Sequence, residues 1–462
     1  MIRAYPTVCF AVLLAIGLRP AQAASWQPLE YAPAPVDNPL KGLVPYRRDV
    51  RDRFPHSMEF AYLPYSALVK GYDEFDWRPL EAILDDVAGR GHQAVFRVYL
   101  EFPGKQGVIP EFLLEDGLRV HKYVHQKTHP FRPVSVETPD YEDENLRRSL
   151  KRFIAALGEK YDGDPRIGFI TAGLLGAWGE WHTYPRPELF AGKAVQEEVM
   201  TAYEAAFRTT HVLLRYPAGE NDPRYAANSG RRFGYHDDSF AWATLHTGRR
   251  GDEWFYMTAL KAAGPDAEAK WKTHPIGGEI RPEAWGRVFD DDPGDERIQS
   301  FRECVEATHV AWLMDSGMFA RKQPPGRIRR AMEQVRRMGY EFHCPRVSIG
   351  AVQDGKLAVK LEIENRGVAP FYYDWPAQWS LLADGSPVKA FPASGKVTHL
   401  LPGEKPRLWS DTLDVSGVNA GKYVLAVQVM NPMRGGKPLR FANRTQDASA
   451  PGWLSLGRVR IP

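Results

Sequence analysis

The sequence predicts a (β/α)8 barrel followed by an antiparallel β-sandwich, and three observations lead to this fold class. Short apolar strands alternate with amphipathic helices from Asn38 to Cys344, which is the order that a parallel α/β fold requires. Eight strand candidates occur in this stretch, the number that closes such a barrel. After Pro345 the apolar periodicity changes to two and no helical pattern follows, which is typical of an antiparallel sheet.

The barrel strands are expected where short apolar runs meet turn residues. They lie at 42–46, 58–64, 93–100, 167–174, 211–216, 233–237, 274–279 and 309–314. The intervening helices carry apolar residues at helical spacing and are expected at 78–91, 142–161, 195–209, 296–307 and 328–338. A long loop at 101–141 interrupts the alternation, as substrate-side insertions in barrels do. An open doubly wound sheet also alternates, but no glycine-rich phosphate loop follows the first strand.

The C-terminal part, 345–462, is expected to be an Ig-like β-sandwich. Residues 356–364 alternate between apolar and charged side chains, which predicts a strand with one exposed face. Residues 379–383 run into Asp384-Gly385, a hairpin signal. Another strand is expected at 423–429. The predicted domains are therefore a barrel at 24–344 and a sandwich at 345–462.

The first 23 residues have the pattern of a cleavable secretory signal peptide. Arg3 makes the start basic, Val8 to Leu18 is apolar, and Ala21-Gln22-Ala23 offers a small-residue cleavage site. This pattern predicts export, so the mature protein is expected in the periplasm or outside the cell. No later segment is long and apolar enough to span a membrane.

Composition excludes some partners and leaves others open. The 60 Lys and Arg nearly balance the 57 Asp and Glu, and without a basic stripe no nucleic-acid partner is expected. The 13 Trp and 20 Tyr fill the core or stack on sugar faces. Cys304 and Cys344 remain after signal removal, and an oxidising compartment allows them to pair or to stay free. The catalytic motifs of serine hydrolases, dithiol enzymes and zinc proteases do not occur. We expect no cofactor and no metal.

One segment, Gly173 to His182, reads G-L-L-G-A-W-G-E-W-H and carries the main catalytic candidate. Glu180 follows a buried strand and stands between Trp178 and Trp181. A carboxyl in such an apolar setting has a raised pKa, which suits a general acid. The alternative is that Glu180 pairs with a nearby arginine and only supports the loop. The two tryptophans and His182 are expected to contact a sugar, although the tryptophans fit core packing equally well.

A second carboxylate, Glu279, ends the strand H-P-I-G-G-E. Glycines at 277 and 278 let a backbone or ligand approach closely. Two carboxylates on two strands that open on one face are what glycosidic-bond hydrolysis uses. Glu279 is therefore expected to act as nucleophile or base, unless it lies on an ordinary surface loop.

Further polar residues lie near the ends of predicted strands. His236 and Asp238 alternate onto one face, where they are expected to bind sugar hydroxyls or, as a third possibility, a hard cation. Arg97 and Tyr99 share a face of another strand. Arg97 and Arg215 each need an acidic partner inside a barrel, either in a structural ion pair or to orient a catalytic glutamate.

Four segments carry a family resemblance: 38–46, 173–182, 235–240 and 275–279. Together they resemble the exported bacterial proteins that carry the DUF4832 domain, often with a DUF4874-like N-terminal half. The resemblance runs from Asn38 through the C-terminal part. It implies a glycosidase-type TIM barrel with a β-sandwich.

The chain is also similar to retaining glycosidases that place the acid/base after strand four and the nucleophile after strand seven. Glu180 and Glu279 fall on those strands. Those enzymes usually have Asn before the acid/base glutamate, to hold the sugar 2-hydroxyl, whereas Gly179 stands there in this chain.

The expected function is hydrolysis of a glycosidic bond in a poly- or oligosaccharide, by a retaining mechanism. Glu180 would be the general acid/base, Glu279 the nucleophile, and His236 with Asp238 would bind hydroxyls. The rival expectation is a non-catalytic carbohydrate-binding or envelope-polysaccharide protein on a glycosidase scaffold. Metal-assisted hydrolysis at His236 and Asp238 is the third. The retaining mechanism is the favoured one, and the sequence leaves open the sugar, the linkage, the anomeric outcome (retaining or inverting) and the oligomeric state.

Overall fold

A computed structural model describes residues 25–49, 53–126 and 132–462. The expected signal peptide, 1–23, lies outside these residues. No helix in the described ranges is long and apolar enough to cross a membrane.

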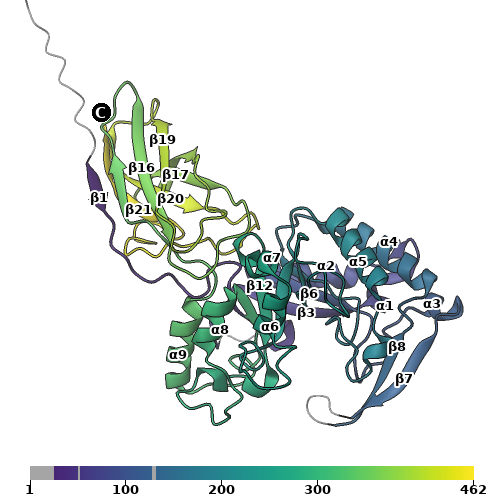
Figure 1. Ribbon diagram of the computed structural model, residues 1–462. Helices are drawn as coiled ribbons and strands as arrows, with labels where there is room; N and C mark the ends of the chain where they lie inside the picture. Colours follow the sequence, from purple (N-terminus) through teal and green to yellow (C-terminus); the bar gives the residue numbers. More distant parts are fainter. Residues whose placement is uncertain (1–24, 50–52, 127–131) are drawn as a thin grey trace, which may run out of the picture.

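Eight parallel strands form one sheet that closes on itself as a barrel (Figure 1). Around the barrel they are β2 (Gly42–Val44), β3 (Met58–Pro64), β6 (Gln93–Tyr99), β9 (Ile167–Thr171), β10 (Val212–Leu214), β11 (Gly234–Phe240), β12 (Ile276–Ile280) and β13 (Trp312–Met314). β13 pairs with β2. The gap between β2 and β3 is closed by a parallel bridge between Tyr46 and Phe60, whose amide donates to Pro45 O at 2.8 Å. The predicted (β/α)8 barrel is confirmed.

Helices surround the barrel because each has one apolar face to bury. The longer ones are α2 (Arg78–Ala88), α4 (Glu144–Tyr161), α5 (Lys193–Ala206), α8 (Phe301–Thr308) and α9 (Pro325–Arg336). The shorter ones are α1 (Tyr65–Leu68), α3 (Glu111–Glu115), α6 (Tyr256–Ala262) and α7 (Pro265–Glu268). Single 3-10 turns occur at Arg47–Asp49, Pro187–Leu189, Lys270–Lys272, Pro282–Ala284 and Arg287–Phe289. Asp143 caps α4 by accepting from Leu146 N at 2.8 Å, which fixes where that helix begins.

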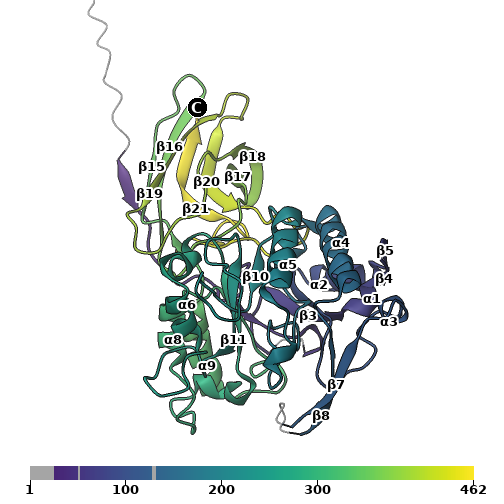
Figure 2. The same cartoon turned by 45° about the vertical axis from the view of Figure 1, so that its right-hand side comes forward.

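The insertion at 101–141 is more ordered than the loop that the sequence predicts. It holds α3 and an antiparallel hairpin of β7 (Val120–His125) and β8 (Val134–Pro139). The hairpin projects from the barrel on the side away from the C-terminal sheets (Figures 1 and 2). Most of its residues are exposed or half-buried, so the two strands carry only a short and weak apolar signal. A second small pair, β4 (Val69–Gly71) and β5 (Glu74–Phe75), follows α1.

The C-terminal part contains two antiparallel sheets (Figure 2). One consists of β1 (Trp26–Pro28), β14 (Phe342–His343), β15 (Arg346–Ile349), β16 (Lys356–Asn365) and β19 (Arg407–Asp414). The other consists of β17 (Ala377–Ala383), β18 (Ser386–Pro392), β20 (Gly421–Val429) and β21 (Leu454–Ile461). Both contribute to the same cluster of buried side chains, as facing sheets of a sandwich would.

The N-terminal residues join the C-terminal sheet instead of the barrel. Trp26, Gln27 and Pro28 pair antiparallel with β15. The sequence analysis assigned them to the barrel domain because pairing between residues more than 300 positions apart leaves no local signal.

The C-terminal part packs against the amino ends of the barrel strands. Tyr373 donates from its hydroxyl to Gly168 O at 2.5 Å, and Asn38 Nδ2 donates to Arg440 O at 2.9 Å. Side chains from inside the barrel, such as Phe60 and Trp312, belong to the same buried cluster as the C-terminal sheets. The carboxyl ends of the strands lie at the opposite end, where active sites of such barrels occur.

Cys304 and Cys344 are both free and buried. Cys304 on α8 belongs to the barrel cluster, and its thiol donates to Gln299 Oε1 at 3.8 Å. Cys344 belongs to the cluster shared with the C-terminal sheets. Burial raises the pKa of both thiols, so neither has the character of a nucleophile.

Candidate active site

Arg97 is the centre of the polar cluster inside the barrel. It lies on β6 and is 1% exposed. Its Nη1 donates to Glu180 Oε1 at 2.9 Å and to the Tyr62 hydroxyl at 3.2 Å, while Nε donates to Thr171 Oγ1 at 2.9 Å. Nη2 lies 3.2 Å from His236 Nε2. One buried guanidinium therefore connects side chains from β3, β9, β11 and the loop after β9.

The loop that carries Glu180 closes over Arg97 because two glycines leave room for it. A Cβ on Gly173 would lie 1.9 Å from Val98 O. Gly179 has φ 71°, and a Cβ there would lie 3.0 Å from Gly173 Cα and 3.2 Å from Arg97 Cδ. A larger residue at 179, such as the Asn of retaining glycosidases, would press against the aliphatic part of the Arg97 side chain.

The tryptophans on either side of Glu180 differ from each other. Both have positive φ, 55° at Trp178 and 56° at Trp181, a conformation rare for bulky residues. Trp181 is 2% exposed and donates from Nε1 to Ala172 O at 2.7 Å. It fills the core and presents no face to a sugar, so its expected binding role is corrected. Trp178 is half-buried and lies 6.4 Å from the ring of Phe102.

Glu279 on β12 is a buried carboxyl with a raised pKa. It is 8% exposed, and the Tyr46 hydroxyl donates to its Oε1 at 3.3 Å. Burial, and next the negative charge of Glu180, raise the pKa of Glu279 to about 8. Glu279 therefore carries a proton near neutral pH, which is the state that a general acid needs.

Glu180 differs from the apolar, hydrogen-bond-poor setting that the sequence suggested. It is 9% exposed and forms an ion pair with Arg97. That part of the expectation is wrong, because the arginine arrives from a strand distant in sequence. The ion pair gives Glu180 a charge-assisted hydrogen bond that orients its carboxyl, whereas Glu279, with its raised pKa, is the carboxyl that holds a proton near neutral pH.

A second ion pair lies beside the first. Arg215 Nε donates to Asp238 Oδ2 at 2.8 Å. Burial would raise the pKa of Asp238, but the charge of Arg215 outweighs it and holds the pKa at about 2. The pKa of His236 is well below its usual value because of burial and the charge of Arg97. His236 is thus neutral and accepts from Arg97. A narrow cavity of about 10 Å³ adjoins this pair and reaches Trp254.

Tyr99 lies at the edge of the cluster. It is 3% exposed, and its ring meets that of Tyr62 edge-on at 5.9 Å. Its hydroxyl accepts from Lys105 Nζ at 3.1 Å. Tyr99 therefore packs beside the site and supports Tyr62 more than it faces a ligand.

Three donor groups at the mouth of the barrel have the spacing of metal ligands. One donor atom each from Glu180, His182 and Asp238 lie within 4.8 Å of one another. However, His182 Nδ1 accepts from Tyr184 N at 3.2 Å, so the ring proton resides on Nε2, 3.6 Å from Glu180 Oε2. A protonated Nε2 offers no lone pair to a metal. The cluster fits hydrogen bonding better than metal binding.

The sequence analysis missed several residues of the cluster. Tyr46, Tyr62 and Thr171 contact Arg97 or Glu279, and each lies near the carboxyl end of a predicted strand. That position was the available signal. Glu101 follows β6, is fully buried, and pairs through its backbone with Ala177 of the Glu180 loop. Burial raises the pKa of Glu101 to about 8.

Comparisons with known proteins give structural likenesses alone. No family model matches the chain, and no curated protein matches it. Endo-glycoceramidase II from Rhodococcus sp. aligns at 10% identity over 84% of this chain and 99% of its own, with a TM-score of 0.40. An endo-beta-1,4-mannanase from Thermotoga petrophila aligns at 9% identity over 94% and 98%, with a TM-score of 0.34. A GH5_18 structure from Bifidobacterium longum subsp. longum aligns at 12% over 60% and 68%, at 0.37. Scores this low carry no argument, and the barrel is established by its own strand pairing.

Proposed function

We propose that this protein hydrolyses a glycosidic bond in a poly- or oligosaccharide, using Glu180 and Glu279. The observation that carries the proposal is a pair of buried carboxyls at the carboxyl end of one barrel. One pairs with Arg97, and the other is protonated near neutral pH. Two carboxyls in such different environments supply the acid and the base of a glycosidase.

The roles that follow are the reverse of those expected from the sequence. Glu279 holds the proton and donates it to the leaving-group oxygen. Glu180, oriented by Arg97, attacks the anomeric carbon, and Glu279 then removes a proton from the water that releases the sugar. The charge of Glu180 raises the pKa of Glu279, which places the two carboxyls in one site, and we propose that they act as a retaining pair, whose carboxyls lie about 5 to 5.5 Å apart.

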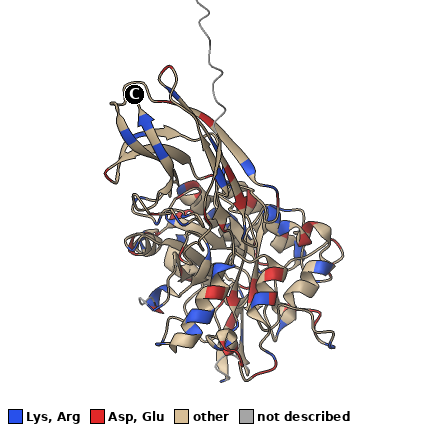
Figure 3. Cartoon of the chain, turned by 90° about the vertical axis from the view of Figure 1, so that its left-hand side faces the viewer, with Lys and Arg blue, Asp and Glu red and all other residues tan. Residues whose placement is uncertain are grey.

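We further propose that the protein is exported from the cell. The signal-peptide pattern of the first 23 residues and the DUF4832 resemblance both support a periplasmic or secreted carbohydrate enzyme. We propose that Trp178, half-buried at the mouth of the barrel, contributes a stacking face for the sugar. Figure 3 shows Lys, Arg, Asp and Glu interspersed over the face in view, which fits an uncharged ligand better than a polyanion.

Paired substitutions test the two roles. In Glu279→Gln the acid is lost, so turnover of a natural glycan should fall by about 10² to 10⁴-fold. An aryl glycoside with a good leaving group needs less protonation, so its first step should fall less. Glu180→Gln should abolish turnover of both substrates, because the nucleophile is required whatever leaves. A panel of polysaccharides and aryl glycosides provides the assay, and NMR of the first product gives the anomer.

Glu188→Gln is the matched control, since Glu188 lies on the same loop, is exposed, and pairs only with Arg186 in the described contacts. Its turnover should equal that of the wild type. The opposite pattern, with Glu180→Gln sparing the aryl glycoside, would restore the roles expected from the sequence. Equal and modest losses in both variants would refute the two-carboxyl mechanism.

A second candidate function is non-catalytic carbohydrate binding at the mouth of the barrel, and the burial of the two glutamates favours it. Glu180 and Glu279 are each less than a tenth exposed, so a sugar could rest on half-buried Trp178 without reaching both carboxyls. Saturable glycan binding by the wild type, retained in both glutamine variants and without product from any substrate, would identify this function.

A further inference from the structure

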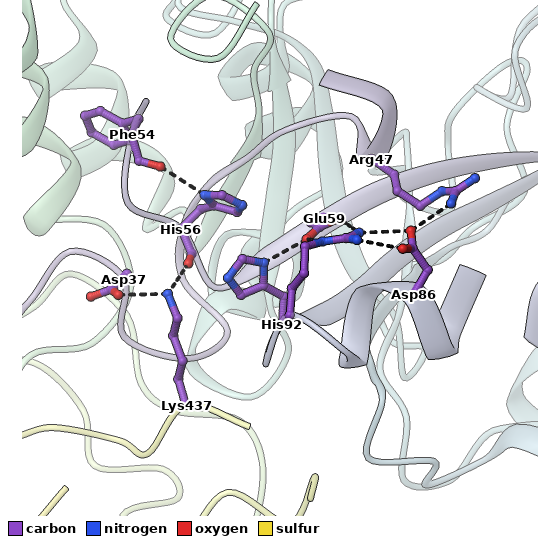
Figure 4. Close-up of polar contacts among 9 residues, drawn as sticks. Asp37, Arg47, Phe54, His56, Glu59, Asp86, His92 and Lys437 are labelled. Atoms are coloured by element: carbon purple, nitrogen blue, oxygen red, sulfur yellow. Dashed lines mark hydrogen bonds and ion pairs between the residues drawn. The ribbon is translucent and has the colours of Figure 1, made fainter. Parts of the chain in front are cut away.

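A second cluster of histidines and a carboxylate lies at the amino end of the barrel, opposite the candidate active site (Figure 4). His56 precedes β3, Glu59 lies on β3, and His92 precedes β6. One donor atom from each lies within 4.8 Å of the others. All three are buried. Since β3 and β6 pair in parallel register from Met58 and Gln93, the barrel itself brings the histidines together.

His56 presents a lone pair without a partner. Its Nδ1 lies 2.9 Å from Phe54 O, and a carbonyl only accepts, so Nδ1 carries the ring proton. Nε2 is then a bare acceptor. His56 is 5% exposed, and Nε2 has no hydrogen-bond partner among the described residues. Buried polar atoms without partners are rare. A histidine whose Nδ1–H donates to a backbone carbonyl is the usual form of a metal ligand.

His92 has the complementary arrangement. Its Nδ1 lies 2.7 Å from Glu59 Oε1, so Nδ1–H donates to the carboxylate and Nε2 keeps its lone pair. The two imidazole rings lie 4.4 Å apart, centre to centre. Carboxylate, histidine and metal in sequence form a common motif of zinc sites.

Both carboxylate oxygens of Glu59 already accept hydrogen bonds. Glu59 is therefore placed to orient a histidine that binds an ion, and not to bind the ion itself. Arg90 donates to Oε1 from Nε at 2.8 Å and to Oε2 from Nη2 at 2.6 Å. Its remaining Nη1 donates to Asp86. On the other side, Lys437 Nζ donates to His56 O at 2.7 Å and to Asp37 at 2.8 Å. The nearby cations therefore already have carboxylate partners, and each of the described carboxylates in this cluster, Glu59, Asp37 and Asp86, is already paired with one of them.

We propose that His56 Nε2 and His92 Nε2 bind a divalent transition-metal ion of the zinc class, with water at its other positions. Glu59 orients His92, as the Phe54 carbonyl orients His56. Neutral imidazole nitrogens suit zinc, copper and nickel, whereas calcium and magnesium require oxygen ligands. The ion would connect the amino ends of β3 and β6 beside Lys437 of the C-terminal part. This role is structural and independent of the proposed hydrolysis.

Titration of the untagged protein with zinc chloride tests the site. Calorimetry should show one bound ion per chain, and magnesium or calcium should give no binding. At free zinc of about 100 times its Kd, the melting temperature should rise by about 3 °C for a chain of this length. Cobalt in place of zinc should give absorption bands typical of nitrogen ligation.

Three variants and one control locate the ion. His56→Gln and His92→Gln should each lose zinc binding and the temperature shift, while Glu59→Gln should weaken zinc affinity by about 10 to 100-fold. His182→Gln is the control, because it removes the histidine of the other three-residue cluster, and it should bind zinc normally. Loss of binding in His182→Gln alone would place the ion at the candidate active site and overturn the proposal. Absence of zinc binding and of cobalt bands in the wild type would overturn it whether or not the variants fold.

Discussion

The two ends of the barrel carry clusters that look alike by distance and differ in their protons. Glu180, His182 and Asp238 at the carboxyl end, like the three residues at the amino end, place their donor atoms within 4.8 Å of one another. His182 accepts a backbone N–H at Nδ1, whereas His56 donates from Nδ1 to a backbone carbonyl. Only the second arrangement leaves Nε2 without a proton, so that its lone pair can bind a metal ion. A list of nearby ligand types therefore does not predict a metal site, because the backbone partner of each ring decides the tautomer.

At each end of the barrel a glutamate forms an ion pair with an arginine, and the two ion pairs differ in how buried the arginine is. The Arg97 side chain is 1% exposed in its pair with Glu180, and the Arg90 side chain is 34% exposed in its pair with Glu59. Arg90 shares Glu59 with His92, so that carboxylate keeps a partner if the arginine is lost. The Arg97–Glu180 and Arg90–Glu59 ion pairs should therefore contribute differently to the free energy of unfolding.

The largest expected effect comes from Arg97→Met. Removing one partner of a buried ion pair leaves an uncompensated charge and costs about 3 to 5 kcal/mol of unfolding free energy. Arg90→Met should cost less, because Arg90 reaches solvent and His92 still donates to Glu59. Urea unfolding of both variants measures the difference through the transition midpoint. Equal losses at the two ends would remove the distinction between them.

The pH dependence of stability should have opposite signs at the two ends. Protonated Glu279 has a pKa raised to about 8, so its contribution is complete below the unfolded value, near 4.5, and is lost as pH rises toward 8. The slope is at most about 1.4 kcal/mol per pH unit. Glu279→Gln should remove this slope and gain stability over the wild type between pH 5 and 8.

Glu59 provides the opposite case. Hydrogen bonds from Arg90 and His92 outweigh burial and lower its pKa, so its contribution is present above about pH 4.5 and is lost as pH falls through the lowered pKa. Glu59→Gln should reduce the loss of unfolding free energy with falling pH below about pH 4.5. It should leave the slope of unfolding free energy against pH unchanged near neutral pH. Thermal unfolding from pH 3 to 8 compares both variants with the wild type. A steeper neutral slope in Glu279→Gln would contradict the assignment of the proton.

The smallest expected effect belongs to Tyr46→Phe. The Tyr46 hydroxyl donates to Glu279 at 3.3 Å and lowers its pKa. A hydrogen bond of this kind contributes about 0.5 to 1.5 kcal/mol, so its removal should raise the pKa of Glu279 by about one unit or less. The alkaline limb of the pH–rate profile should move up by the same amount. Tyr31→Phe, which removes a hydroxyl bound to Glu341, is the control and should leave the profile in place.

The sequence predicted the barrel because its signals are local. Strands such as Met58–Pro64 and helices such as Glu144–Tyr161 follow from apolar spacing within a short window. The exposed hairpin β7–β8 and the pairing of Trp26–Pro28 with β15 were missed. The first is mostly exposed and its apolar signal is short and weak, and the second depends on residues at the far end of the chain.

The sequence predicted the main residues of the candidate site, but not which of them form ion pairs or hold a proton. Glu180, Glu279, Arg97 and His236 follow from the rule that parallel strands open at their carboxyl ends. That rule depends on strand order, which the sequence supplies. The tertiary structure alone decided that Arg97 pairs with Glu180, that burial beside Glu180 raises the pKa of Glu279, and that Trp181 is core. Charge states depend on distances of a few ångströms between strands far apart in the chain, and local sequence patterns contain no information about such distances.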